Sequence, residues 1–181
     1  MSRIISGRYG GLYIKNPKHS IRPTTGKAKE YIFNVLQSLE GRRVIDLFSG
    51  TGALGIEALS RYADHVTFID NKQKSIQLIS DNLTLIKAPE KTWSCIKNNV
   101  LRFLEHDTML YDVIIADPPY DLTLSPAFFE SCKNHLASSG IFVLEYSIRT
   151  SFDTGGWEAV RVKKMGDTGI WMFLKNIDLS E

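Results

Sequence analysis

Cysteine is scarce in this 181-residue chain, and its two cysteines, Cys95 and Cys132, lie far apart and lack the paired spacing of a zinc site. We therefore expect reduced thiols and no disulfide framework. The four histidines form neither an i, i+4 pair nor an H-E-x-x-H motif, so we expect no metal. No apolar run approaches the roughly 18 residues that a membrane span needs, and the basic N-terminus leads into no signal-peptide pattern. These absences predict a cytoplasmic protein that does not engage a membrane.

Acidic residues are nearly absent from the first 30 positions, which hold seven Lys or Arg and a single acid, Glu30, for a net charge of +6. The rest of the chain holds the other 15 Lys or Arg and 19 acids, a net charge of −4. This asymmetry predicts that the N-terminal segment meets a polyanion. A basic surface that is merely solvated is the alternative.

The N-terminal segment is predicted to be a small hairpin, with short alternating stretches at Arg3–Ser6 and Leu12–Lys15 separated by glycines. A helix is then predicted from a cap at Thr24 or Thr25 through Leu39, where Gly41 ends it. We expect the hairpin to be a poor core but a good basic arm, and Lys29 and Glu30 to face solvent. We therefore divide the chain into a hairpin arm with a linker, residues 1–23, and a main domain, residues 24–181.

The main domain begins with a strand, a glycine turn and a helix. Val44 to Phe48 is a short apolar run typical of a buried parallel strand. Gly50, Gly52 and Gly55 follow in G-x-G-x-x-G spacing, which lets backbone N–H groups approach a ligand before a helix begins, here predicted over Ala53–Ala63. Alone, this spacing is compatible with a nicotinamide or flavin dinucleotide, with a nucleoside cofactor, or with a turn that binds nothing.

Two acids near this turn favour a nucleoside cofactor without phosphate. Asp46 lies at the end of the first strand, where its carboxylate would repel a pyrophosphate and attract a cationic ligand. S-adenosylmethionine carries an ammonium and a sulfonium group. A second strand, His65 to Asp70, ends in an acid twenty residues after Gly50, where a carboxylate can accept hydrogen bonds from both ribose hydroxyls. A structural role for Asp46 is the alternative.

The remaining pattern alternates strand and helix, which is typical of a parallel sheet with helices on both faces. The predicted elements are a helix over 72–86, strands over 93–97 and 111–116, a helix over 126–137, a strand over 141–146, and a closing hairpin formed by 157–164 and 170–175. We predict an α/β, Rossmann-like domain with seven strands and an antiparallel last pair. Asn99 follows the third strand and is placed to read an adenine edge, unless it is simply a turn residue.

The segment Asp117-Pro118-Pro119-Tyr120 follows the fourth predicted strand and is the candidate catalytic site. The amino group of a nucleobase or an amide is a poor nucleophile because its lone pair is delocalised. The Asp117 carboxylate and the Pro118 carbonyl could accept its two N–H bonds and so direct the lone pair at a methyl donor. Tyr120 offers a flat face on which a planar substrate can stack. An ordinary loop is the alternative for a D-P-P-x sequence, but its position after a parallel strand favours chemistry.

These residues together resemble a known family. The matching segments are Arg3-Ile4-Ile5-Ser6-Gly7, Arg22-Pro23-Thr24-Thr25, Phe33-Asn34-Val35-Leu36, the long block from Asp46 to Arg61, and Asp117 to Tyr120. In this order they resemble the RsmD family of bacterial 16S ribosomal RNA guanine-N2 methyltransferases. The resemblance implies a class I methyltransferase fold, S-adenosylmethionine as donor, and as acceptor a guanine of 16S rRNA in the small ribosomal subunit or its assembly intermediate. We expect a monomer.

The resemblance and the residue patterns give one set of expected site residues. Those for catalysis are Asp117, Pro118 and Tyr120; those for the cofactor are Asp46, Phe48, Gly50, Gly52, Asp70, Asn71, Asn99 and Val100; and those for RNA are Arg3, Arg8, Arg22, Lys27, Pro119 and Tyr120. The chain departs from the common family pattern in having Phe48-Ser49-Gly50-Thr51-Gly52, Asp70 in place of Glu, and Lys29 in place of Arg.

Other functions stay open on the residues alone. Adenine N6 and a glutamine amide present the same planar nitrogen to the Asp117 segment, a dinucleotide-dependent oxidoreductase could use the glycine turn, and a non-catalytic RNA-binding assembly factor could retain the fold.

Overall fold

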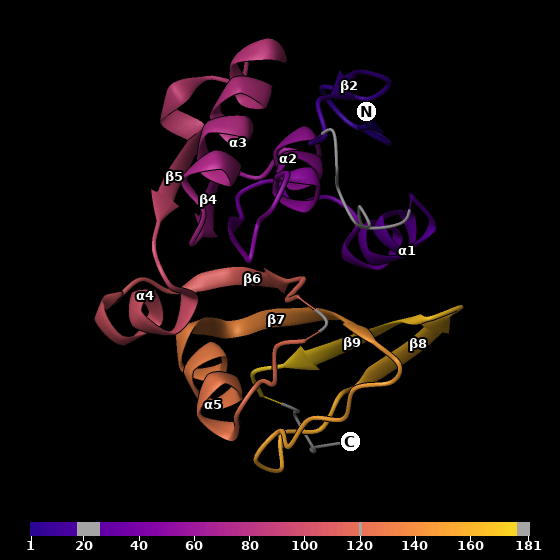
Figure 1. Cartoon of the computed structure of the whole chain (residues 1–181), viewed down its shortest axis with the longest axis vertical. Coiled ribbons are helices and arrows are strands. Elements are labelled where there is room, and N and C mark those ends of the chain that lie inside the picture. Colours follow the sequence, from indigo (N-terminus) through magenta and orange to yellow (C-terminus); the bar gives the residue numbers. More distant parts are fainter. Residues whose placement is uncertain (18–25, 120, 177–181) are drawn as a thin grey trace.

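The computed structural model describes residues 1–17, 26–119 and 121–176. Seven strands form one sheet in the order β5-β4-β3-β6-β7-β9-β8 (Figure 1). Five are parallel, namely β5 (Trp93–Lys97), β4 (His65–Asp70), β3 (Arg43–Leu47), β6 (Tyr111–Ala116) and β7 (Leu136–Ser147). The last two, β9 (Thr168–Leu174) and β8 (Arg161–Met165), add antiparallel pairs. The predicted seven-stranded α/β sheet with an antiparallel last pair is confirmed.

Helices cover both faces of this sheet because successive residues of a strand point to opposite faces. Val44 of β3 belongs to a core shared with α1 (Gly26–Leu36), α2 (Ala53–Ser60) and α3 (Gln73–Leu85). Its neighbour Ile45 belongs to a second core, shared with α4 (Val100–His106) and α5 (Pro126–His135). A short 3₁₀ turn, η1 (Glu90–Thr92), leads into β5.

The N-terminal hairpin is present but short, with β1 (Ser2–Arg3) paired antiparallel to β2 (Tyr13–Ile14). The expectation that it would be a poor core is wrong. Ile4 and Ile14 are 0% and 1% exposed and belong to the core on the α1, α2 and α3 face. The predicted boundary at residue 23 lies outside the described residues and stays a prediction.

Three other expectations need correction. The first helix ends at Leu36, before the predicted Leu39, since Gln37 has a left-handed φ of 58°. Lys29 does not face solvent: it is 2% exposed, although Glu30 is exposed as predicted. The strand predicted over 141–146 begins earlier, at Leu136, because Leu136 pairs with Tyr111 before the register shifts to Ile141 opposite Val113. The closing hairpin is confirmed, although its first strand is shorter than predicted and its second begins earlier, at Thr168.

Candidate functional site

The expected site residues emerge from one edge of the sheet. Leu47, the last residue of β3, lies in register with Ile69 of β4 and with Ala116 of β6. Asp70 at the end of β4 lies opposite Lys97 at the end of β5. Because these four strands are parallel, the segments that follow them share the carboxyl edge of the sheet, which is where open α/β sheets bind ligands.

The glycine turn after β3 is held to its neighbours by hydrogen bonds. Ser49 N donates to the Ile69 carbonyl at 3.0 Å, and Ser49 Oγ donates to the Asp46 carbonyl at 2.6 Å. Gly50 has a φ of +54°, and a Cβ placed there would have only the Phe48 carbonyl oxygen within 4 Å, at 3.8 Å. Its glycine is therefore required by backbone conformation, and the space above the turn is open. Phe48 also has a positive φ, 60°, which is uncommon for a bulky side chain.

Asp70 closes the turn from the neighbouring strand. Its Oδ2 accepts a hydrogen bond from Gly50 N at 2.9 Å, and its Oδ1 accepts one from Lys72 N at 2.8 Å. Each carboxylate oxygen has a second lone pair, so the side chain retains capacity to accept ligand hydroxyls. Asp70 therefore lies against the glycine turn, and Asn71, the residue after it, is exposed.

Asp46 lies beneath the turn, 1% exposed, and its Oδ2 accepts a hydrogen bond from Gly55 N at 2.9 Å. Burial raises the pKa of Asp46 to about 8; the Gly55 hydrogen bond opposes this, and the charges of Asp117 and Asp70 add to it. Three carboxylates therefore meet at the carboxyl edge. Such a cluster favours a cationic ligand, which would relieve their mutual repulsion.

Asp117 belongs to this cluster, and the two prolines follow it in the chain. Asp117 is half-buried at the end of β6, and its backbone N–H donates to the Leu47 carbonyl at 3.4 Å. Pro118 is buried and Pro119 exposed. The structure thus brings the predicted catalytic segment next to the predicted cofactor turn. Tyr120, like Arg22, lies outside the described residues.

An apolar pocket flanks the turn on the β5 side. It has a volume of about 80 Å³ and includes three of the expected cofactor residues, Phe48, Asn99 and Val100. Leu124 and Phe128 complete its apolar wall. Asn99 Oδ1 accepts a hydrogen bond from Arg102 N at 3.2 Å and so caps α4, which is the structural role that had been the alternative. Its amide N–H₂ group remains available as a donor.

The predicted RNA-contacting cations lie on the surface but not at the carboxyl cluster. Arg3, Arg8 and Lys27 are exposed, and the Arg8 guanidinium lies 5.5 Å from the centre of the Tyr62 ring. The structure does not join these residues to Asp117 by any direct contact among the described residues.

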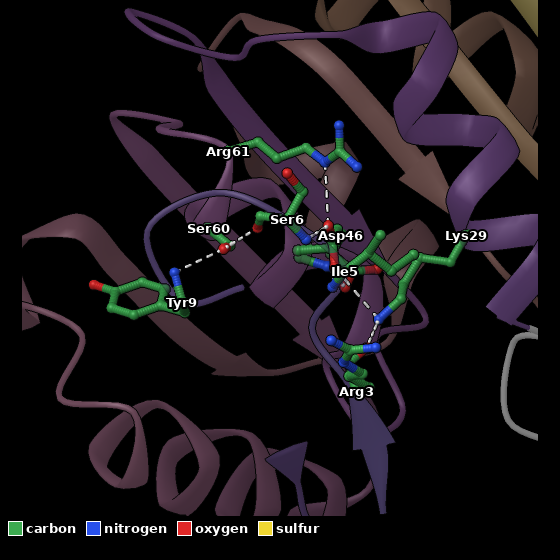
Figure 2. Close-up of polar contacts among 10 residues, drawn as sticks. Arg3, Ile5, Ser6, Tyr9, Lys29, Asp46, Ser60 and Arg61 are labelled. Atoms are coloured by element: carbon green, nitrogen blue, oxygen red, sulfur yellow. Dashed lines mark hydrogen bonds and ion pairs between the residues drawn. The ribbon is translucent and has the colours of Figure 1, made fainter. Parts of the chain in front are cut away.

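Sequence reasoning missed the buried polar network that attaches the N-terminal segment to α2 (Figure 2). Glu57 is fully buried, and its carboxylate accepts hydrogen bonds from Ile5 N at 2.7 Å and Ser6 N at 3.2 Å. The same carboxylate pairs with Lys29 Nζ at 3.4 Å and with Arg61 Nε at 3.1 Å. The i, i+4 spacing of Glu57 and Arg61 is typical of an ion pair on one helix, but nothing in the local pattern indicated Lys29. Gly7 was the available signal of a tight approach, because a Cβ there would lie 1.9 Å from the Ser60 carbonyl oxygen.

No three His, Cys, Asp or Glu side chains within residues 1–17, 26–119 and 121–176 are grouped so that they could hold a metal ion. In the same ranges, every helix is too short or too polar to cross a bilayer.

Comparison with known proteins agrees with this geometry. The model of the family described as Conserved hypothetical protein 95 matches residues 2–174. A putative rRNA methyltransferase, YlbH of Bacillus subtilis, is 32% identical over 183 residues, covering 96% of this chain and 98% of that protein. Ribosomal RNA small subunit methyltransferase D of Escherichia coli is 28% identical over 177 residues, covering 94% of this chain and 88% of that protein.

Solved structures show the same architecture. A putative methyltransferase from Escherichia coli, yhhF, superposes with a TM-score of 0.82 at 28% identity, covering 96% of this chain and 97% of that chain. The 16S rRNA N2 G1207 methyltransferase of Thermus thermophilus, solved with AdoMet and guanosine, has a TM-score of 0.75 at 18% identity, covering 97% of this chain and 49% of that chain. At that identity the likeness shows the fold alone. With its class I methyltransferase fold and a match over nearly its full length, the chain belongs to the family described as Conserved hypothetical protein 95, the RsmD family.

Proposed function

We propose that this protein methylates the exocyclic N2 amino group of a guanine in 16S ribosomal RNA, with S-adenosylmethionine as the methyl donor. The observation that carries the proposal is the position of Asp117 and Pro118, at the end of β6 beside the glycine turn of β3. Membership of the RsmD family supports the reaction class, and the names of the rRNA methyltransferase relatives support the substrate class.

The residues around the turn fit S-adenosylmethionine by their chemistry. Asp70 would accept the ribose hydroxyls, and the apolar pocket at Phe48 and Val100 would receive the adenine ring. The open space above Gly50 and the carboxylates of Asp46 and Asp117 suit the cationic methionine part. When bound, this cofactor supplies an electrophilic methyl group. Asn71 and Asn99 would complete its polar contacts.

The task of the protein's own residues is to prepare the amine. The Asp117 carboxylate and the Pro118 carbonyl would each accept a hydrogen bond from one N–H of the amino group. These two hydrogen bonds favour a pyramidal nitrogen whose lone pair is no longer delocalised into the ring and is directed at the methyl donor. Asp117 also stabilises the positive charge that develops on nitrogen, and the surplus N–H proton leaves through this carboxylate or to water. Neither proline has an N–H that could compete for these acceptors. A base treated in this way must leave its stack, so the target guanine is unpaired or flipped.

RNA binding is assigned to the N-terminal side of the molecule. Arg3, Arg8, Arg22 and Lys27 would contact phosphates, while Pro119 and Tyr120 would contact the target base. We propose that a monomer acts on the small subunit or its assembly intermediate.

The test is transfer of label from S-[methyl-³H]adenosylmethionine to small subunits that lack the modification, followed by mapping of the labelled nucleotide. Asp117→Ala is expected to lower turnover by roughly 10²–10⁴-fold, the range for a lost transition-state contact, with the affinity for S-adenosylhomocysteine retained. Asp112→Ala is the matched control, since Asp112 lies on the same strand but pairs with Arg42 at the surface, at 3.0 Å. Its turnover should equal that of the unaltered protein.

The competing functions give different results in this assay. Label found on adenine or on a protein amide would identify that group, and not guanine N2, as the acceptor. Absence of label, together with full RNA affinity, would indicate a non-catalytic assembly factor. A thermal shift with NAD but not with S-adenosylhomocysteine would indicate an oxidoreductase.

A further inference from the structure

The edge strand β8 carries positive charge that the proposed function does not use. Arg161, Lys163 and Lys164 occupy three of its five positions, all exposed, and the strand contains no acid. Among the described strands β8 pairs only with β9 and therefore forms one edge of the sheet. Asp167, in the turn that follows, pairs with Arg149 at 3.8 Å.

The cations at the end of β8 lie at the same edge of the sheet as Asp117. Because β9 is antiparallel to both β7 and β8, β8 runs in the same direction as β6 (Figure 1). Lys163 and Lys164 are the third and fourth of the five residues of β8 and so approach the carboxyl edge. Three strand spacings separate β6 from β8, a distance of about 14 Å at about 4.8 Å each. A stacked nucleic-acid strand rises about 3.4 Å per nucleotide, so this distance corresponds to about four nucleotides. A strand whose base reaches Asp117 can thus place a nearby phosphate at β8.

Helix α1 connects β8 with the cations already assigned to RNA. Lys163 Nζ lies 5.9 Å from the centre of the Tyr31 ring on α1. Lys29, two residues earlier on the same helix, donates a hydrogen bond to the Arg3 carbonyl at 2.7 Å. Lys27 is exposed on the first turn of α1. The N-terminal hairpin, α1 and β8 therefore lie in sequence across the molecule, each with exposed cations.

Protection of an exposed strand edge is the simpler explanation for lysines on β8, because charged edge strands resist pairing with other sheets. The composition of the opposite edge of the sheet indicates that edge protection alone does not explain these cations. Strand β5 forms that edge and has one charged residue, Lys97, among its five. Charges of either sign would also protect an edge, whereas β8 has cations alone.

Arg161 and Lys163 are two positions apart and so share the face of β8 that lies against α1, whereas Lys164 points to the opposite face. We propose that Arg161 and Lys163 of β8 bind phosphates of the substrate RNA about four nucleotides from the target guanine, extending the N-terminal contact surface across α1. This inference rests on the proposed function, since it takes RNA as the substrate.

The experiment compares two double charge reversals in the full chain. Arg161→Glu with Lys163→Glu alters the face of β8 that lies against α1. Lys87→Glu with Lys91→Glu changes the net charge equally at exposed lysines that precede β5, at the opposite edge. Binding to a 16S rRNA transcript and to unmethylated small subunits is measured from 50 to 300 mM salt, with methyl transfer and thermal unfolding measured in parallel.

Loss of two phosphate contacts should make the slope of log K against log salt shallower by about 1.4, at about 0.7 per contact on a single strand. At 0.1 M salt this corresponds to roughly 25-fold weaker binding of both RNA and subunits for the β8 variant. The control should change the affinity much less and leave the slope as in the unaltered protein. Arg161→Gln with Lys163→Gln serves as a second variant if the reversal lowers the unfolding temperature.

Three results would overturn the inference. Unchanged slope and affinity in the β8 variants would show that the two cations protect the edge only. Weaker binding to subunits with full affinity for free RNA would assign β8 to a protein contact. Equal loss in both double variants would show a general charge effect. In each case, guanine methylation by the unaltered protein would leave the proposed function standing, and its absence would reject that function separately.

Discussion

Removal of the Glu57 carboxylate is the sharpest test of how the N-terminal segment is held. Glu57 is 0% exposed, and its partner Lys29 has a side chain only 3% exposed. Burial lowers the pKa of Lys29 from its ordinary value even though Glu57 acts to raise it. Without Glu57 the ammonium would be left buried and unpaired, which costs roughly 3–5 kcal/mol in comparable pairs.

We expect Glu57→Ala to lower the free energy of unfolding by about that amount, a large part of the roughly 5–15 kcal/mol typical of a domain. Glu57→Gln should cost less, because its amide oxygen can still accept a hydrogen bond from Ile5 N or Ser6 N. Lys29→Met placed on Glu57→Gln should recover part of the loss, because it removes the unpaired charge.

Urea denaturation gives both the free energy and the slope m, which reports the surface exposed on unfolding. A reduced m would indicate that the N-terminal segment is already detached in the folded variant. The control is Arg149→Ala, which removes a surface pair at 3.8 Å from a side chain 82% exposed and should cost less than about 1 kcal/mol. If Glu57→Ala costs no more than this control, the buried network does not stabilise the fold as argued.

Two further predictions concern the glycine turn. Binding of S-adenosylmethionine should tighten as pH rises from 6 to 7.5, because the pKa of Asp46, raised to about 8, leaves this residue protonated at low pH, whereas a cationic ligand favours the carboxylate. Calorimetry in buffers of different ionisation enthalpy should show that binding releases a proton. An Asp46→Asn variant with the same pH dependence would contradict this prediction. The folded-state pKa lies above the ordinary 3.8, so without ligand the contribution of Asp46 to stability is largest below pH 3.8 and falls as pH rises toward 8. Gly55→Ala should destabilise the fold strongly, since its Cβ would lie 2.2 Å from the Phe68 ring. Gly26→Ala, whose Cβ would meet nothing within 4 Å, is the comparison, and equal unfolding temperatures would refute the packing argument.

The parallel strands were predictable because each is a short apolar run between turns. The strands His65–Asp70, Trp93–Lys97 and Tyr111–Ala116 have the predicted bounds. The same logic failed at the end of α1. Leu39 continues the apolar spacing and is buried, at 2% exposed, but it lies beyond the helix, where its N–H donates to the Arg61 carbonyl. Periodicity reports which residues are buried, and it does not report whether the backbone that buries them is helical.

The residues that meet at the carboxyl edge could be predicted from the sequence, whereas the buried network around Glu57 could not. Residues that end adjacent parallel strands are brought together by topology, so the meeting of Asp46, Asp70 and Asp117 followed from the order of the strands. The burial of Lys29 depends on Ile5 and Ser6, which are more than 20 residues away in sequence and reach Glu57 only in the folded chain. No local pattern contains a contact of that kind, and a lysine on a helix is ordinarily assigned to the surface.

Helix α2 contacts both the site at the carboxyl edge and the N-terminal segment, and it therefore limits how far that segment can move relative to the site. The first turn of α2 is tied to the site, where Gly55 N donates to Asp46 at 2.9 Å. Two residues later Glu57 binds the backbone of the N-terminal segment, and Ser60 accepts a hydrogen bond from Tyr9 N at 3.0 Å (Figure 2). All eight residues of α2 are buried, so the helix has little freedom to shift. The cations of the N-terminal segment are therefore fixed relative to the carboxyl edge of the sheet and do not lie on a free arm, so any RNA that they bind would be held at a set distance from Asp117.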